Sequence, residues 1–232
     1  MIKPEQLTFP WSKPSKATFD HFYLDEDNLS IKDILFKEDD LFLYGIAGTG
    51  KTFLLQSLCN HYSDNKKTSL YIPMNEVMNY GSDFLDSLEE LDLICIDDLD
   101  SIAGNDNWEI AIFNLINNCL ITQCRLVFCS QLNPSSINFN LKDLFSRIKK
   151  MDHIELLPVN ERNLKEAIKF ITNIKLLEFG DNEINYLITH TKRNISNLAK
   201  IINELDELSL QLKRKITTVS YTHLTLPTKR IV

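Results

Sequence analysis

The fold of this chain is decided by eight consecutive residues, Gly45-Ile46-Ala47-Gly48-Thr49-Gly50-Lys51-Thr52. They match the phosphate-binding loop pattern G-x-x-x-x-G-K-[ST] at every fixed position. An apolar run, residues 41–44, precedes them, and a second run, residues 53–58, has the composition of a helix. This order is needed because the chain must wrap a polyphosphate and then point the N–H groups of a new helix at it. The stretch predicts a nucleotide-binding α/β fold; the alternative is a glycine-rich turn with a solvated lysine.

The loop positions have separate predicted roles. The three glycines lack a Cβ, so backbone amides can close on phosphate oxygens. Lys51 places a positive charge against the β- and γ-phosphates. The Thr52 hydroxyl completes the shell of a magnesium ion that keeps most of its waters. ATP or ADP with Mg²⁺ is therefore the predicted cofactor, and the loop does not decide between the two nucleotides.

Composition limits the function classes. The 232 residues are 44% hydrophobic, enough for one sizeable core and a small second domain. A net charge of −7 argues against a phosphate-binding stripe, so contact with DNA is expected to be indirect or weak. The five cysteines form no C-x-x-C pair and are expected to be reduced core residues of a cytoplasmic protein. No apolar run approaches the ~20 residues of a membrane span, so no membrane partner is expected.

The first 157 residues predict an arm followed by an α/β domain. Residues 1–16 contain three prolines and no helical period, which favours an extended arm. Apolar strands and amphipathic helices then alternate over residues 17–157, which predicts a five-stranded parallel sheet with helices on both faces. The candidate strands are Leu41–Tyr44, Ser69–Pro73, Leu93–Asp97, Arg125–Cys129 and His153–Leu157.

The strand signal stops at Pro158, and residues 158–217 predict a small three-helix lid. The expected helices are Glu161 to about Glu178, closed by Gly180; Asp181 to about Thr191; and Asn194 to about Leu212. Residues 218–232 lack a helical period and contain several threonines and Pro227. They are expected to be a disordered tail or sequence foreign to the natural protein.

Polar residues follow two of the predicted strands. Two carboxylates, Asp97 and Asp98, end a buried strand and are costly there unless a positive group meets them. Magnesium is the expected partner, with Asp97 holding its water shell and Asp98 orienting an attacking water; alternatively, Asp97 caps the next helix. Gln131 follows another strand and either bonds the γ-phosphate or the water, or is a loop residue.

Several segments resemble the bacterial initiator clade of AAA+ ATPases, the DnaA/Hda family. Residues 17–22, Ala-Thr-Phe-Asp-His-Phe, resemble the motif at the start of its ATPase domain, and residues 144–148, Leu-Phe-Ser-Arg-Ile, resemble its arginine-finger segment. Residues 97–104, 108–109 and 111–113 are similar to the Walker B motif and following helix of the Hda regulators within this family. The resemblance spans roughly residues 17–217, and it implies an AAA+ domain with a helical lid.

The arm resembles a docking motif for the DNA polymerase sliding clamp (the β subunit), over residues 6–11, Gln-Leu-Thr-Phe-Pro-Trp. An extended peptide needs a few strong anchors to offset its ordering cost. Gln6 supplies directional hydrogen bonds, Leu7 and Phe9 fill apolar pockets, and Pro10 stiffens the chain. Such hexamers also occur by chance, which is the alternative.

The resemblance further implies that Arg147 is an arginine finger that acts in trans on ATP bound to DnaA. The alternative is a structural salt bridge. The family's sensor arginine falls at Ser196 here, so intrinsic hydrolysis is expected to be weak. No DNA-binding domain follows the lid in this sequence, which favours a regulator over an initiator.

The expected function is that of a cytoplasmic, adenine-nucleotide-binding regulator of replication initiation that docks on the clamp and stimulates hydrolysis of DnaA-bound ATP. Association with copies of itself, as a homo-oligomer, is left open by the sequence. The competing expectations are a helicase-loader ATPase that acts on a replicative helicase, and a nucleotide-gated interaction module with no catalytic role.

Overall fold

The computed structural model describes residues 17–191 and 194–212, and these form two compact units. The first contains residues 17–22, 30–47 and 51–156; the second contains residues 23–29, 48–50, 157–191 and 194–212. None of the helices in the described ranges is both long and apolar enough to cross a bilayer.

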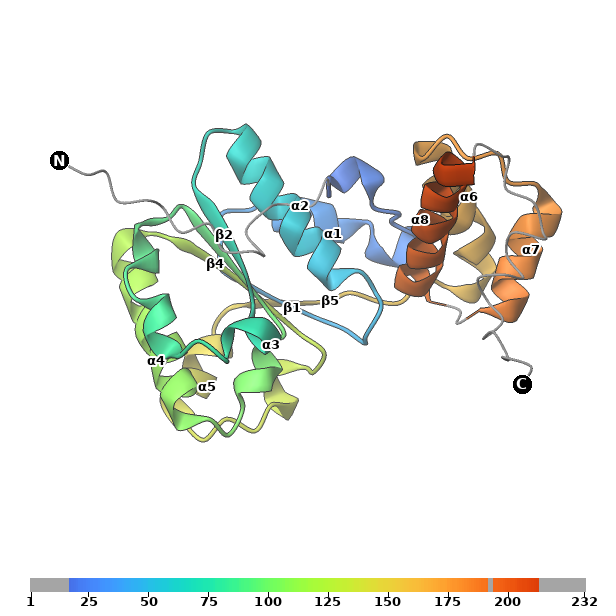
Figure 1. Cartoon of the computed structure of the whole chain (residues 1–232). Helices are drawn as coiled ribbons and strands as arrows, with labels where there is room; N and C mark the ends of the chain where they lie inside the picture. Colours follow the sequence, from blue (N-terminus) through green and yellow to red (C-terminus); the bar gives the residue numbers. More distant parts are fainter. Residues whose placement is uncertain (1–16, 192–193, 213–232) are drawn as a thin grey trace, which may run out of the picture. The chain divides into compact units, whose positions relative to one another are not determined.

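Five parallel strands form the sheet of the first unit, in the order β2-β3-β4-β1-β5 (Figure 1). Their bounds are β1 (Leu41–Tyr44), β2 (Ser69–Pro73), β3 (Leu93–Asp97), β4 (Arg125–Ser130) and β5 (Asp152–Glu155). The prediction of a five-stranded parallel sheet is confirmed. The predicted range of β5 was wrong by one residue at its start and two at its end, because β5 pairs residue for residue with the four residues of β1.

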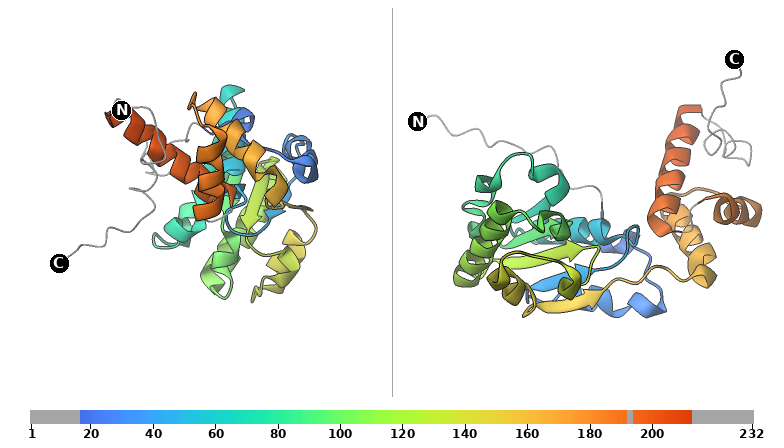
Figure 2. Two further views of the ribbon diagram at one scale, coloured as in Figure 1. Left: turned by 90° about the vertical axis from the view of Figure 1, so that its right-hand side faces the viewer. Right: turned by 90° about the horizontal axis from the view of Figure 1, so that it is seen from below.

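Helices cover both faces of this sheet (Figures 1 and 2). On one face lie α1 (Ser30–Leu35) and α2 (Lys51–Asp64); on the other lie α3 (Met74–Val77), α4 (Asp106–Thr122) and α5 (Lys142–Ile148). Strand side chains alternate between these two layers, as the two-residue period of a strand requires. Phe42 packs into the core on the α4 side, and its neighbour Leu43 packs against α2.

Short 3₁₀ helices connect these elements. They are η1 (Phe19–His21), η2 (Glu26–Asn28), η3 (Ser82–Leu85), η4 (Leu88–Glu90), η5 (Leu99–Ile102), η6 (Pro134–Ser136) and η7 (Glu161–Asn163).

All five cysteines of the chain lie in the core of the first unit. Each is a free thiol and none is more than 6% exposed. The prediction that they are unpaired core residues is confirmed. They are Cys59, Cys95, Cys119, Cys124 and Cys129.

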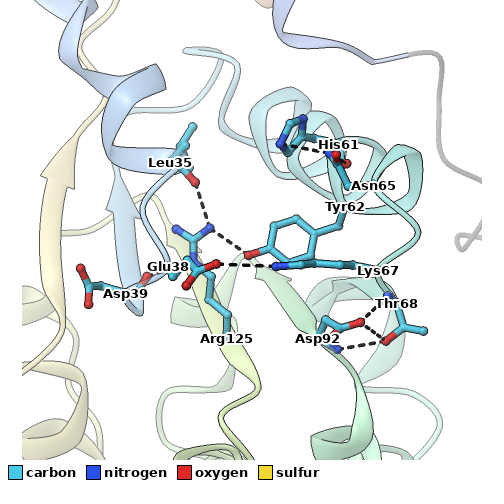
Figure 3. Close-up of polar contacts among 10 residues, drawn as sticks. All are labelled: Leu35, Glu38, Asp39, His61, Tyr62, Asn65, Lys67, Thr68, Asp92 and Arg125. Atoms are coloured by element: carbon cyan, nitrogen blue, oxygen red, sulfur yellow. Dashed lines mark hydrogen bonds and ion pairs between the residues drawn. The ribbon is translucent and has the colours of Figure 1, made fainter.

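A buried arginine ties the helices of one face to the amino-terminal edge of the sheet (Figure 3). Arg125, the first residue of β4, donates from Nε to the Asp39 carbonyl (3.0 Å) and from Nη1 to the Leu35 carbonyl (2.9 Å). Nη1 also donates to the Tyr62 hydroxyl of α2 (3.4 Å). Because Leu35 ends α1, the guanidinium satisfies a carbonyl that the helix itself cannot pair.

In its described residues the second unit is built around three α-helices. It contains α6 (Leu164–Ile174), α7 (Asp181–His190) and α8 (Ile195–Leu212). The first of these helices is shorter than the sequence indicates, because Leu176 has a left-handed φ of 56° and α6 ends before it. Gly180 does not close α6 but precedes α7 as its N-cap residue. The apolar faces meet in one core formed by Leu164, Ile168, Ile184, Leu187, Leu198, Ile202 and Leu205.

Candidate nucleotide-binding site

The phosphate-binding loop follows the carboxyl end of β1 and leads into α2, which begins at Lys51. Gly45 fits between two neighbouring strand ends: its N–H donates to the Ser130 carbonyl (3.3 Å), and a Cβ at this position would overlap the Leu156 carbonyl oxygen. Gly48 and Gly50 have φ values of 83° and 100°, in the region that favours glycine. The loop path therefore depends on these three glycines.

Lys51 places a buried ammonium over this loop. The side chain is 6% exposed, and Nζ donates to the carbonyls of Gly45 (2.7 Å) and Ile46 (3.0 Å). Within the described ranges no carboxylate lies within ion-pair distance of this ammonium. A buried cation that is held only by carbonyls favours an anionic ligand at this point.

Asp97, the last residue of β3, accepts two hydroxyl hydrogen bonds on one oxygen. Its Oδ2 accepts from Thr52 Oγ1 (2.5 Å) and from the Tyr71 hydroxyl (3.0 Å). Its Oδ1 accepts from the Asp98 N–H (3.0 Å), and the residue is 3% exposed. Burial, and next the charge of Asp97, raise the pKa of Tyr71. The structure thus brings Thr52 and Asp97 together, and the residue that caps η5 is Asp98, not Asp97.

Asp98 lies beside this pair in a left-handed conformation, with φ 54°. Its carboxylate accepts from Asn75 Nδ2 at 2.7 Å. Burial is the main cause that raises the pKa of Asp98, followed by the negative charges of Asp97 and Asp100. Three neighbouring carboxylates are tolerated here because each is held by a donor, and because the Lys51 charge opposes part of their repulsion.

Gln131 contacts the site with its backbone N–H and not with its side chain. Asp100 Oδ1 accepts from the Gln131 N–H (3.2 Å) and from Ser130 Oγ (2.8 Å), while the Gln131 side chain is exposed. Sequence reasoning missed Asp100, Tyr71 and Asn75. One signal was present for Asn75: it lies two residues after the end of β2, and Asp98 directly follows the neighbouring strand β3, so both stand at the edge where the carboxyl ends of parallel strands meet.

The donor set fits a magnesium nucleotide. A hydroxyl and carboxylates are the hard oxygen ligands that Mg²⁺ prefers, and Lys51 supplies a cation for phosphate. Residues 17–191 and 194–212 hold no group of three His, Cys, Asp or Glu side chains able to bind a metal by themselves. The ion would be held by the Thr52 hydroxyl and by phosphate oxygens, with Asp97 accepting hydrogen bonds from its waters, and it would supply the charge that neutralises the phosphates.

Arg147 lies near the amino-terminal ends of the strands, whereas Lys51 lies near their carboxyl-terminal ends. It belongs to α5 and lines a cavity of about 450 Å³ with Asp40 and Asp152. These two residues stand at the amino-terminal ends of β1 and β5, whereas Lys51 follows the carboxyl end of β1. Within the described chain the guanidinium forms no ion pair, so the structure gives no support to a salt-bridge role.

The clamp-docking residues Gln6, Leu7, Phe9 and Pro10 lie outside the described residues. Ser196, where the family's sensor arginine was expected, stands in the first turn of α8.

Two family models match the chain. The bacterial DnaA ATPase domain matches residues 32–153, and the lid domain of Hda matches residues 161–219. An uncharacterized protein of Haemophilus influenzae is 30% identical over 219 residues, which cover 92% of this chain and 95% of that protein.

Solved structures share the fold. Domain III of the Thermotoga maritima replication initiation protein DnaA matches with a TM-score of 0.75 and 22% identity, over 90% of this chain and 95% of that one. AMPPCP-bound DnaA from Aquifex aeolicus matches with a TM-score of 0.68 and 23% identity, over 86% of this chain and 68% of that one. With a five-stranded parallel sheet, a complete phosphate-binding loop and a helical lid, the chain belongs to the DnaA/Hda family of AAA+ proteins.

Proposed function

We propose that this protein is an adenine-nucleotide-binding regulator of replication initiation that stimulates hydrolysis of ATP bound to DnaA. Nucleotide binding rests on the buried Lys51 ammonium and on the Thr52–Asp97 hydrogen bond at the carboxyl edge of the sheet. The related DnaA from Aquifex aeolicus was solved with the adenine nucleotide analogue AMPPCP, which supports the same ligand class here. The match to the lid domain of Hda supports a regulator.

The position of Arg147 carries the proposal. Its guanidinium lies at the sheet edge away from Lys51, so it is badly placed to reach a nucleotide on its own loop. It is half-buried and forms no ion pair among the described residues, so its charge remains available to a neighbouring molecule. An arginine supplied in trans stabilises the charge that spreads over the γ-phosphate oxygens during phosphoryl transfer.

Docking on the sliding clamp is the second part of the proposal. The arm carries Gln6, Leu7, Phe9 and Pro10 in one short segment, which suits a peptide that binds an apolar cleft through a few anchors. The clamp would hold the regulator on DNA and raise its local concentration near DnaA. Because Ser196 stands in place of a sensor arginine, the protein's own hydrolysis of ATP is weak. The bound ADP or ATP instead serves to shape the surface that binds DnaA.

A single-turnover assay tests the catalytic part. DnaA is loaded with radiolabelled ATP and mixed with DNA-loaded clamp and the regulator. Wild-type protein accelerates hydrolysis, and Arg147→Ala removes the acceleration almost completely, since fingers in trans contribute on the order of 10³–10⁵ in rate. Lys150→Ala, which changes an exposed cation of the same cavity lining, is the control and retains most of the effect. An Arg147→Ala protein that keeps half of the wild-type acceleration contradicts the role.

A pull-down tests the docking part. The double variant Gln6→Ala, Leu7→Ala loses clamp binding and keeps its melting temperature and nucleotide affinity. Retained clamp binding by this variant would mean that the hexamer is a chance match. A wild-type protein that binds nucleotide but leaves DnaA hydrolysis unchanged, and that instead binds a replicative helicase, would support the helicase-loader function.

A further inference from the structure

Two hydroxyl groups from different elements converge on one oxygen of Asp97. Thr52, in the first turn of α2, and Tyr71, in the middle of β2, both donate to Oδ2, at 2.5 and 3.0 Å. Tyr71 pairs in register with Cys95, two residues before Asp97, so its long side chain must run along the sheet to reach the strand end. The ring packs against the core on the α2 side, which fixes where the hydroxyl points.

These contacts leave the carboxylate little free capacity. A carboxylate has about four lone-pair positions on its two oxygens. The two hydroxyls occupy both positions of Oδ2, and the Asp98 N–H occupies one position of Oδ1. Asp97 is 3% exposed, so bulk water cannot compensate for a lost donor. The Cys129 thiol, a weak donor, also lies against this carboxylate, so the capacity that remains suits a hydrogen bond from a cation-bound water.

We propose that the Tyr71 hydroxyl is a positioning residue that keeps Asp97 a hydrogen-bond acceptor and not a direct cation ligand, and thereby favours Mg²⁺ over Ca²⁺ at the nucleotide site. The inference rests on the proposed nucleotide function and adds a cation-selecting residue to it. It follows from a difference between the two ions. Mg²⁺ gives up its waters reluctantly and is served by an acceptor for those waters, whereas Ca²⁺ takes six to eight oxygen ligands and binds carboxylates directly.

Removal of the hydroxyl frees one lone pair of Oδ2 for direct coordination. Tyr71→Phe does this and keeps the ring in the core. The binding of a fluorescent ADP analogue is titrated with Mg²⁺ and, separately, with Ca²⁺, and the cation midpoints are compared. The Mg²⁺ midpoint of the variant rises about tenfold, the loss expected from one hydrogen bond to a charged group. The Ca²⁺ midpoint stays constant or falls, and nucleotide affinity in chelator is unchanged.

Tyr62→Phe is the matched control. Its hydroxyl also lies in the first unit, but it accepts from Arg125 near the amino-terminal edge of the sheet (Figure 3). Both cation midpoints of this variant match the wild type. Circular dichroism melting of both variants checks that one lost hydroxyl leaves the fold intact.

The outcomes separate this inference from the function on which it rests. Equal increases of the Mg²⁺ and Ca²⁺ midpoints in Tyr71→Phe would mean that Tyr71 only supports the fold, and unchanged midpoints would mean that it does not position Asp97; either result overturns the inference and leaves nucleotide binding standing. A wild-type protein without cation-dependent nucleotide binding would overturn the proposed nucleotide function as well.

Discussion

Asn28 and Leu157 exchange two hydrogen bonds although 129 residues separate them. Asn28 Nδ2 donates to the Leu157 carbonyl (3.1 Å), and the Leu157 N–H donates to Asn28 Oδ1 (3.0 Å). The same Nδ2 donates to Asp25 Oδ1 (2.8 Å), whose other oxygen accepts from the Asn160 N–H (3.2 Å). Asn28 and Asp25 are each 3% exposed. The segment of residues 23–29 thus belongs to the second unit. It holds the chain at Leu157, the first residue of that unit after β5.

We expect Asn28→Ala to lower the free energy of unfolding by about 1–3 kcal/mol, because it removes the hydrogen bonds that the buried Asn28 amide makes with Leu157 and Asp25. Urea denaturation followed by circular dichroism measures the loss. Asn65→Ala is the control, since that amide is exposed and donates to the His61 carbonyl within the last turn of α2. If the two variants lose the same free energy of unfolding, the hydrogen bonds of Asn28 do not stabilise the second unit.

We expect Gly45→Ala to destabilise the protein more than Gly81→Ala. Both glycines have positive φ values, but a Cβ on Gly45 overlaps the backbone of Leu156, while a Cβ on Gly81 meets no atom within 4 Å. Gly81→Ala therefore costs only the backbone strain of about 1–3 kcal/mol. Gly45→Ala adds a steric clash that must move β5 or the loop. Melting temperatures of the two variants check this order, and equal melting temperatures would contradict it.

We expect Lys51→Ala to weaken ADP binding about 100-fold or more, because the variant loses charge-assisted hydrogen bonds to phosphate. Isothermal titration calorimetry measures the affinity. The control is Lys67→Ala, which removes an exposed lysine paired with Glu38 (3.6 Å) and leaves the affinity unchanged. An unchanged ADP affinity in Lys51→Ala would remove the site assignment.

We expect Asp40→Asn to become more stable than the wild type as the pH rises from about 4 to 7. Burial is the main cause that raises the pKa of Asp40 above its ordinary value of 3.8. The folded state therefore binds the proton more tightly, and the wild type loses stability as the pH rises from 3.8 through the raised pKa. Asparagine stays neutral and can still accept the hydrogen bond from the Leu126 N–H (2.8 Å). The melting-temperature difference between variant and wild type should grow with pH and then level off.

Asp92 has a lowered pKa, so its effect on stability changes with pH in the direction opposite to that of Asp40. Hydrogen bonds from the Thr68 backbone, and next from its hydroxyl, lower the pKa of Asp92 (Figure 3). Its ionised form therefore contributes stability above the ordinary pKa of 3.8, and that stability is lost as the pH falls through the lowered pKa. Asp92→Asn should be less stable than the wild type at pH 7 and approach it in acid. Parallel pH curves for Asp40→Asn and Asp92→Asn would contradict both assignments.

Much of the first unit was predictable from the sequence because its signals are local. Strands β1, β2 and β3 have the predicted bounds, since each is a short apolar run limited by polar residues. The loop from Gly45 to Thr52 was recognisable because phosphate binding demands particular residues at fixed spacing. The position of Thr52 beside Asp97 followed from topology, because the loop that leads from β1 to Thr52 and the end of β3 lie at the same, carboxyl, edge of the sheet.

The remaining features depend on contacts between distant residues. β5 ends at Glu155 because its partner β1 is short, and no property of residues 153–157 encodes that limit. Tyr71 resembles any half-buried aromatic residue of a strand until its hydroxyl is seen to reach Asp97. Asn28 lies in a polar stretch without pattern, and its role appears only when Leu157 is brought to it. The end of α6 depends on the left-handed Leu176, a conformation that leucine rarely adopts.

The distribution of the cysteines gives the protein a natural reporter of its own unfolding. Every thiol is at most 6% exposed and belongs to the first unit, so a thiol reagent can react only after that unit opens. Labelling kinetics therefore measure the opening of the nucleotide-binding unit alone, because the second unit contributes no sulfhydryl. Cys95 and Cys129 lie in strands that end at the candidate site. A bound nucleotide that stabilises this edge should slow their labelling, which makes occupancy of the site readable by mass spectrometry without an added probe.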